Sequence, residues 1–252
     1  PGNSGGALID MSGHLLGINS AILTRGGGSN GVGFAIPANL VARVLAEAQA
    51  GKARFERPWA GLTGQPVDMA LATALGLPRP EGVLIAELHP QSPFAAGGLL
   101  VGDVILSLDD HPVTSPQEMM YRLAVAGVGQ AARVGYSRAG APASASVALT
   151  PPPGADAPPI TLTADVALRG LSVAAITPAT IAALDLPLAA TGVVVTDAQG
   201  LAARAGLRPG DILLAINGAP VATPEDVATL ATARTRSWTI DLARGGQRTR
   251  LF

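Results

Sequence analysis

A long internal repeat constrains the fold of this chain more than any other feature. The stretch Gly98–Leu106 reappears as Gly206–Leu214, and a Gly-Asp pair keeps its place in each copy. The match continues without a gap, because Asp110–Pro116 corresponds to Gly218–Pro224. A period of about one hundred residues is too long for a solenoid, so the sequence predicts two copies of one domain.

Each copy carries the same order of local signals. The pattern predicts a strand, a short helix, a strand, a Gly-Asp turn, a further strand and a helix. Ser115–Glu118 has the form of a capping box with proline at the first helical position, and Thr223–Asp226 is a near variant. We interpret the Gly-Asp turns as structural, with the aspartate capping nearby amides, and the arginines around Gly245 as a solvated hairpin.

Outside the repeats, the chain divides into an N-terminal segment and a linker. Apolar runs bounded by glycines predict short strands, and apolar residues at helical spacing between Leu40 and Ala48 predict a helix that Gly51 stops. Pro151–Pro159 predicts a semi-rigid extended spacer. We therefore assign residues 1–52 to the N-terminal segment, 57–150 to the first repeat, 151–159 to the linker and 160–252 to the second repeat. The predicted class is α+β, mostly β.

Composition excludes several classes of function. Charged residues make up 14% of the chain and the formal net charge is −1, so nothing favours nucleic acid as a partner. The absence of cysteine excludes disulfides and thiolate metal sites, and no apolar run is long enough to span a bilayer. The chain opens on Pro1 without a methionine, so we expect the natural N-terminus and any export signal to be missing.

The pentapeptide Gly2-Asn3-Ser4-Gly5-Gly6 is the first candidate for chemistry. A serine hydroxyl is a weak nucleophile that needs a base and hydrogen-bond donors for the developing oxyanion. The glycines let the backbone turn sharply, so that the amides of Gly2 and Ser4 can converge on one point. Taken alone, the motif is more often a plain turn, and its meaning depends on its neighbours.

Those neighbours resemble the last part of the chymotrypsin-fold domain in HtrA/Do serine proteases. The family's segments GNSGGxL, GxxxGIN and GxGFAIP are matched by residues 2–8, 13–19 and 31–37, and the resemblance extends through both repeats. It implies Ser4 as the nucleophile, with the backbone amides of Gly2 and Ser4 in the oxyanion hole. It also implies a specificity pocket that comprises Ile18, Asn19, Ser20, Ala21, Phe34, Ala35 and Ile36. Residues 1–52 would then be a C-terminal remnant of a chymotrypsin-like β-barrel with its exit helix.

The chain departs from that family in its triad. Family members carry the histidine and the aspartate before the serine, and neither residue precedes Ser4 here. His14, His89 and His111 all fall in predicted turns, where a solvated ring is the favoured interpretation. We therefore expect this chain alone to be proteolytically inactive.

The two repeats resemble PDZ domains of the bacterial protease type. Such domains add the C-terminal strand of a peptide to a sheet edge beside a helix and hold its carboxylate on backbone amides. The resemblance implies carboxylate loops and a helix wall made of Trp59, Ala60, Gly61, Leu62, Met120 and Leu123 in the first copy, and of Arg169, Gly170 and Leu171 in the second. A place in the core is an equal alternative for each helix residue.

The resemblance implies a periplasmic serine endopeptidase of protein quality control that degrades unfolded polypeptides, present here as its C-terminal part. Its partners would be unfolded polypeptides and peptide C-termini, and the whole protein would be a trimer-based homo-oligomer. No metal or organic cofactor is implied. A second hypothesis stays open: a non-catalytic PDZ scaffold that binds peptides and carries a vestigial protease segment.

Overall fold

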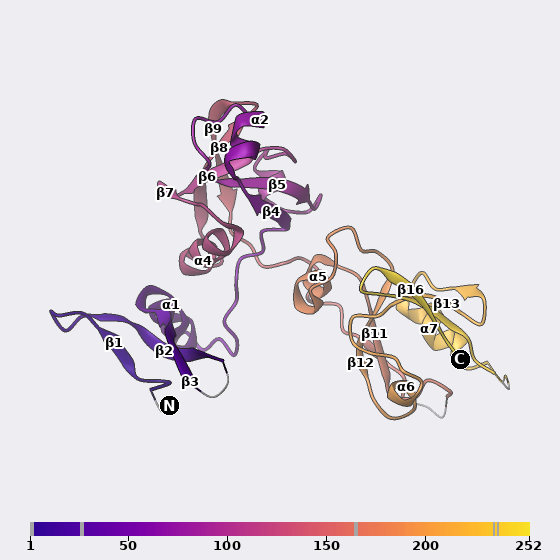
Figure 1. Cartoon of the computed structure of the whole chain (residues 1–252). Coiled ribbons are helices and arrows are strands. Elements are labelled where there is room, and N and C mark those ends of the chain that lie inside the picture. The colour runs from indigo at the N-terminus through magenta and orange to yellow at the C-terminus, as the bar shows by residue number, and fades with distance from the viewer. Residues whose placement is uncertain (1–2, 26–27, 164–165, 234, 236) are drawn as a thin grey trace.

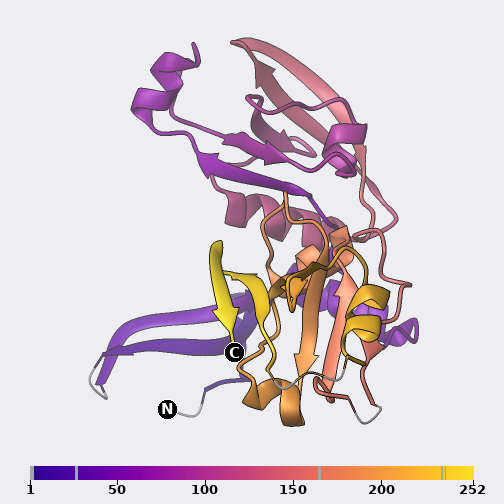
Figure 2. The ribbon, with the colours of Figure 1, turned by 90° about the vertical axis from the view of Figure 1, so that its right-hand side faces the viewer.

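Three open antiparallel sheets with short helices make up the structure, a computed structural model that describes residues 3–25, 28–163, 166–233, 235 and 237–252. One sheet belongs to the N-terminal segment and one to each repeat, which confirms the α+β class. The colours of Figures 1 and 2 follow this order, from indigo through magenta and orange to yellow.

The N-terminal segment forms a three-stranded sheet in the order β1-β2-β3, followed by a helix. Its elements are β1 (Ala7–Ile9), β2 (Leu15–Arg25), β3 (Gly28–Pro37) and α1 (Ala38–Gln49). The predicted helix is confirmed, and it ends just before Gly51, whose φ of 82° favours glycine.

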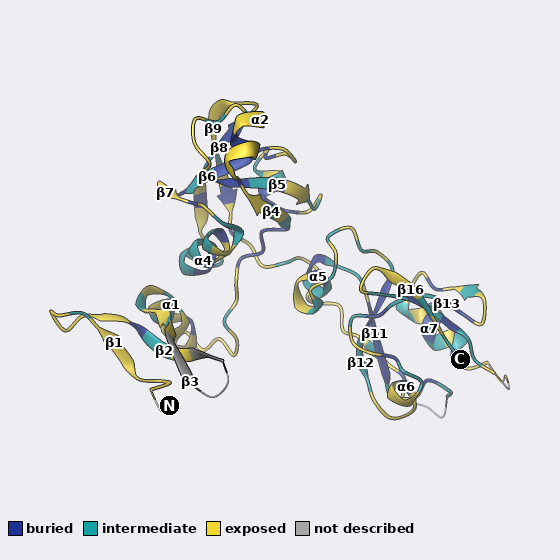
Figure 3. Cartoon of the chain, viewed as in Figure 1, coloured by how far each residue is buried: buried dark blue, intermediate teal, exposed yellow. Residues whose placement is uncertain are grey.

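Apolar side chains of this small sheet remain exposed although α1 packs against β2 and β3. Ile9 is 59% exposed and Phe34 is 54% exposed, and Figure 3 shows the residues of the segment whose burial is described mostly in the colour of exposed residues. Within the described part of the chain, no core cluster includes a residue before Ala60. The sheet therefore presents an apolar surface of the kind that a larger domain would cover.

The first repeat is a sheet in the order β4-β5-β6-β8-β9, with β7 paired to β6. Its elements are β4 (Leu62–Pro66), α2 (Met69–Ala74), β5 (Val83–Leu88), α3 (Pro93–Ala96), β6 (Val104–Leu108), β7 (His111–Pro112), α4 (Pro116–Ala126), β8 (Ala131–Arg138) and β9 (Ala141–Ala148). The strand β4 forms one edge of this sheet.

The second repeat follows the same plan, in the order β10-β11-β12-β13-β15-β16 with β14 paired to β13. Its elements are β10 (Ile160–Thr161), β11 (Leu171–Ala175), α5 (Pro178–Leu184), β12 (Val193–Ala198), α6 (Gly200–Arg204), β13 (Ile212–Ile216), β14 (Ala219–Pro220), α7 (Pro224–Leu230), β15 (Ile240–Arg244) and β16 (Gln247–Leu251). Two copies of one domain are confirmed. The short helices α3 and α6 were not predicted, and β10 has no counterpart in the first repeat.

Each repeat encloses its own apolar core. In the first, Phe94 and Ile85 are fully buried between the sheet and the helices, and Met119 and Leu123 of α4 join them at 1% exposure. In the second, Leu171, Ile216 and Leu242 are fully buried. Since each core is closed within one repeat, each repeat is built as a domain of its own.

The two predicted helix caps differ in detail. Thr223 and Asp226 form the complete box: the Asp226 amide donates to the Thr223 hydroxyl (3.2 Å), and the Thr223 amide donates to the Asp226 carboxylate (2.8 Å). In the first repeat the Ser115 hydroxyl accepts from the Glu118 amide (3.2 Å), but the Glu118 carboxylate accepts from the Thr114 amide instead (3.0 Å). Hydrogen bonds, first that from the Thr114 amide and then those from the Arg122 and Thr114 side chains, lower the pKa of Glu118.

Each Gly-Asp turn holds a buried aspartate in a clamp made by one arginine. Arg138 Nε and Nη2 donate to the two carboxylate oxygens of Asp103 at 2.7 Å each, and Nη2 also donates to the Gly98 carbonyl at 2.8 Å. The Leu100 amide donates to the same carboxylate at 2.8 Å, so the predicted capping of a nearby amide is confirmed.

The second repeat builds the same clamp from its own residues. Arg244 donates to both oxygens of Asp211 and to the Gly206 carbonyl, each at 2.7 Å, and the Arg208 amide adds a bond of 2.8 Å. The interpretation of Arg244 as a solvated hairpin residue was therefore wrong. Arg244 ends β15 just before the Gly245-Gly246 turn, and its place in the sequence does not indicate Asp211, which lies 33 residues earlier, immediately before β13.

Replacement of Asp103 by Asn is expected to destabilise the first repeat by about 2 kcal/mol at neutral pH, because charge-assisted hydrogen bonds are lost at a site where Asp103 is 2% exposed. Burial raises the pKa of Asp103, but bonds from Arg138 and Leu100 outweigh it and hold the pKa below its ordinary value of 3.8. A carboxylate with a lowered pKa stabilises the fold above its unfolded-state pKa and loses that contribution as pH falls through the folded-state value.

The difference in the free energy of unfolding between Asp103→Asn and the unchanged chain is therefore expected to shrink below pH 3.8. Urea unfolding followed by Trp59 fluorescence in a Trp238→Phe background measures it. Asp110→Asn is the matched control, since Asp110 is 74% exposed beside Arg133, and we expect a cost of less than about 0.5 kcal/mol. Equal costs for the two substitutions would contradict a special role for the clamp.

Candidate functional site

The serine motif forms a tight turn fastened to β2. The Gly5 amide donates to the Asn19 carbonyl (2.8 Å), and the Asn19 amide donates back to the Gly6 carbonyl (2.9 Å). Gly5 has φ of 84°, the left-handed conformation that glycine adopts without strain. Gly2, predicted to supply an oxyanion amide, lies outside the described residues.

The residues predicted to line a specificity pocket lie together beside this turn. In the pairing of β2 with β3, Ile18 is opposite Ile36 and Asn19 is opposite Ala35, while Ala21 is opposite Phe34 across an irregularity in register. Ser20 stands at that irregularity, and its hydroxyl donates to the Phe34 carbonyl (3.1 Å). The two predicted stretches are thus neighbouring strands next to Ser4.

The Ser4 hydroxyl donates to the Ser20 carbonyl at 3.2 Å. His14, the histidine of the N-terminal segment, instead pairs its Nδ1 with Asp10 at 3.1 Å, and its side chain is 79% exposed. Hydrogen bonds, first that from the His14 amide, lower the pKa of Asp10. This agrees with a solvated turn for His14, and the described residues give Ser4 no imidazole partner.

In the first repeat, the predicted carboxylate loop precedes the edge strand β4 and is held rigidly. The Trp59 amide donates to the Thr150 carbonyl (2.9 Å), and the Gly61 carbonyl accepts from the His89 amide (2.8 Å). The buried Ser92 hydroxyl donates to the Ala60 carbonyl (2.6 Å). Within the described residues, the amides of Ala60 and Gly61 receive no backbone partner.

Two packing features explain the sequence of this loop. A Cβ on Gly61 would lie 2.9 Å from both the Ser92 Cβ and the Trp59 ring, and Gly61 has φ of 60°. The ring of Trp59 meets His89 edge-on, with centroids 5.3 Å apart. His89 is therefore a packing partner of the loop, and its half-buried ring is only partly solvated.

The helix α4 beside this loop divides its residues between core and surface. Leu123 is 1% exposed and belongs to the core, whereas Met120 is 39% exposed. Met120 lines a cavity of about 470 Å³ together with Arg57, Leu40, Pro116, Gln117, Tyr121 and Ala124. Of the two helix residues predicted for the groove, Met120 is thus the one that reaches an open surface.

In the second repeat, the amides of the corresponding loop are already paired. The Arg169 amide donates to the Val166 carbonyl (3.1 Å), Gly170 to Leu162 (2.8 Å) and Leu171 to Leu168 (3.1 Å). The two loops, which the sequence presents as equivalents, therefore differ in the donors that they leave open.

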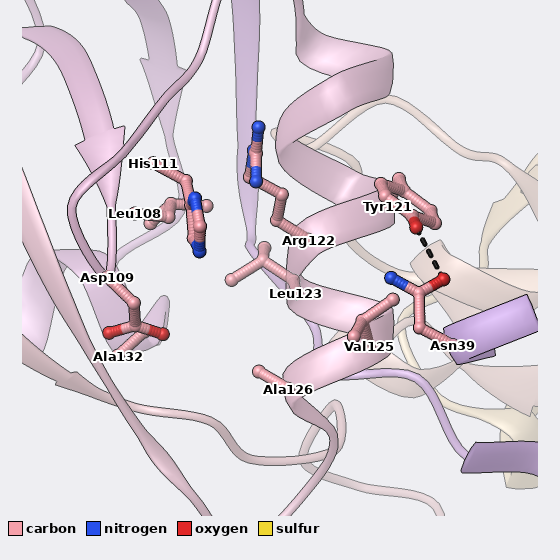
Figure 4. Close-up of a pocket in the computed structure, with 10 residues that line it drawn as sticks. All are labelled: Asn39, Leu108, Asp109, His111, Tyr121, Arg122, Leu123, Val125, Ala126 and Ala132. Atoms are coloured by element: carbon pink, nitrogen blue, oxygen red, sulfur yellow. Dashed lines mark hydrogen bonds between the residues drawn. The ribbon is translucent and has the colours of Figure 1, made fainter. Parts of the chain in front are cut away.

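A further cavity, which was not predicted from the sequence, is lined by other residues of α4 and by Tyr121. Figure 4 shows it between α4 and the segment with Asp109 and His111, with Asn39 at its rim, and its volume is about 250 Å³. The Tyr121 hydroxyl donates to Asn39 Oδ1 at 2.6 Å, which ties α1 to the first repeat. Arg122 is already paired with Glu118 at 2.7 Å, so the charges around the cavity are partly matched.

Two further features of the described residues bear on the class of site. In the described ranges, no group of three or more His, Asp or Glu residues is placed to hold a metal ion. None of the helices in the described part of the chain has the length and hydropathy to cross a bilayer.

Comparison with known proteins adds independent information. Family models described as PDZ domain match residues 61–149 and 192–244. A "Probable periplasmic serine endoprotease DegP-like" of Pseudomonas fulva (strain 12-X) is 36% identical over 98% of this chain and 53% of its own length. The "Periplasmic pH-dependent serine endoprotease DegQ" of Escherichia coli (strain K12) is 32% identical over 98% of this chain and 52% of its own.

The chain thus spans about half the length of the curated relatives that it matches. A solved structure, "HtrA-type protease AlgW with decapeptide", is 36% identical over 61% of this chain and 47% of its own, with a TM-score of 0.45, so the assignment rests on the sequence matches. With PDZ models on both repeats and these relatives along nearly its whole length, the chain belongs to the HtrA-type, DegP-like family of serine endoproteases with PDZ domains.

Proposed function

We propose that this chain supplies the nucleophile and the peptide-binding domains of a periplasmic serine endoprotease that degrades unfolded polypeptides. In the whole protein, Ser4 attacks the scissile carbonyl, and the amides of Gly2 and Ser4 stabilise the oxyanion. The observation that carries the proposal is the turn at Ser4, which lies against the β2–β3 pair that bears the predicted specificity residues.

The base belongs, in this proposal, to a part of the protein outside these 252 residues. The chain's match to only half of each relative supports this division. So does the apolar surface of the first sheet, where Ile9 and Phe34 are more than half exposed. A histidine held by an aspartate would take the proton of Ser4 and return it to the leaving amine. By itself, this chain is inactive.

The first PDZ domain selects substrates by their C-termini. A peptide strand would pair with the open edge of β4, its carboxylate would accept hydrogen bonds from the amides of Ala60 and Gly61, and its last apolar side chain would lie near Leu62 and Met120. The fixed position of the loop, bonded to Ser92 and His89, lowers the entropy cost of this binding. The whole protein is proposed to assemble as a trimer-based homo-oligomer.

A fluorophosphonate probe is expected to react with Ser4 in this chain at least about a thousandfold more slowly than in the whole protein, because Ser4 lacks its base. Intact mass spectrometry with peptide mapping measures the labelling. Ser12, an exposed serine of the same segment, is the internal reference and should react as slowly as Ser4.

Rapid labelling of Ser4 in the 252-residue chain would contradict the missing base. If Ser4 stayed unlabelled in the whole protein as well, the alternative of a non-catalytic PDZ scaffold would be favoured.

A peptide with an apolar C-terminus is expected to bind the first PDZ domain at least about tenfold more tightly as the free acid than as the amide, since charge-assisted hydrogen bonds are involved. Nuclear magnetic resonance of the full chain should place the shifts on the amides of Ala60 and Gly61. Equal affinity for the two forms would rule out the carboxylate loop.

Gly61→Ala should weaken this binding, because the new methyl group would collide with Ser92 and Trp59. Gly129→Ala is its matched control: Gly129 has φ of 86°, and a Cβ there meets no atom within 4 Å. Equal losses in the two variants would mean that backbone strain, and not the loop, decides the effect.

A further inference from the structure

The edge strand that would receive a peptide is open in one PDZ domain and occupied in the other. In the first, β4 pairs with β5 alone among the strands in the described part of the chain. In the second, the equivalent strand β11 pairs with β12 on one side and with β10 on the other. The β10 pairing is antiparallel, with Ile160 opposite Val173 and Thr161 opposite Ser172. The first residues of the second repeat thus add a strand to its binding edge.

Leu162, the residue after β10, makes the contacts expected of the last residue of a bound peptide. Its amide donates to the Leu171 carbonyl at 2.8 Å, and its own carbonyl oxygen accepts from the Gly170 amide at 2.8 Å. That oxygen therefore stands where one carboxylate oxygen of a ligand would lie. The Leu162 side chain is 7% exposed and packs in the domain core, as a ligand's terminal apolar side chain would.

Side chains and the neighbouring helix close the groove further. The hydroxyls of Thr161 and Ser172 lie 2.9 Å apart across the two strands. The helix α7, equivalent to α4 of the first domain, packs against both β10 and β11. The amides of Arg169 and Leu171 donate to the carbonyls of Val166 and Leu168. Together with Gly170, which donates to Leu162, all three loop amides are therefore already hydrogen-bonded.

We propose that residues 160–162, with the sequence Ile-Thr-Leu, are a built-in ligand of the second PDZ domain, so that external C-termini bind to the first domain alone. The inference rests on the proposed peptide recognition and specifies where it takes place. Only residues 163–168 separate Leu162 from the loop. A tether that short holds a ligand at an effective concentration in the millimolar range, which an external peptide at micromolar concentration does not overcome.

The experiment titrates the full, isotope-labelled chain with the peptide Pro-Pro-Ile-Thr-Leu, which copies residues 158–162 and carries a free carboxylate. In the unchanged chain, we expect shifts at Ala60 and Gly61 and none at Arg169 and Gly170. In Leu162→Glu, a charge expels the built-in segment from the apolar pocket. The second loop should then respond, with an apparent affinity raised at least about tenfold, because the groove is open for a larger fraction of the time.

Thr163→Glu is the matched control: it places the same charge at the next, exposed position and should leave the second loop silent. Equal shifts in both loops of the unchanged chain would overturn the inference, and so would a silent second loop in a folded Leu162→Glu chain. If Leu162→Glu unfolds the domain, Leu162→Ala at saturating peptide decides in the same way. A first loop that fails to respond speaks only against the proposed function, since the second loop is read separately.

Discussion

Asp103 and Asp211 lie almost fully buried at the start of a central strand, and each is neutralised by one arginine from a neighbouring strand. A buried carboxylate without partners would cost several kcal/mol, so its position is tenable only while the arginine and one amide hold it. Because each arginine also bonds the carbonyl of Gly98 or Gly206, one side chain joins three separate segments. The clamp thereby fixes the starts of β6 and β13, which are inner strands of their sheets.

The two PDZ domains share this frame and differ at one edge. At the start of the first domain, the Trp59 amide is bonded to the Thr150 carbonyl, and the outer edge of β4 stays unpaired among the described residues. The chain enters the second domain through β10 and Leu162, which cover β11. An unpaired edge strand invites another strand, whether from a substrate or from the same chain. The residues at the start of each domain thus decide whether its edge strand is available for pairing.

The N-terminal segment holds the proposed nucleophile, Ser4, in a defined position. Backbone bonds between Gly5, Gly6 and Asn19 set the serine turn against β2, so the position of Ser4 needs no base to be defined. Its hydroxyl, bonded to a carbonyl, still lacks the acceptor that would activate it. The position of Ser4 is therefore defined within this chain. The activation of its hydroxyl belongs to the proposal for the whole protein.

The sequence by itself determined the features that rest on local chemistry. Glycines mark the turns, Ser115 and Thr223 begin helices, and the repeat places the same elements twice, because these signals act over a few residues. The exposure of Met120 but not Leu123, the arginine that pairs with each buried aspartate, and the packing of His89 on Trp59 were decided only by tertiary structure. So was the strand that fills the second groove. Each of these features joins residues that are far apart in the chain or depends on which segment pairs with a sheet edge. Contacts of this kind produce no pattern in the local sequence.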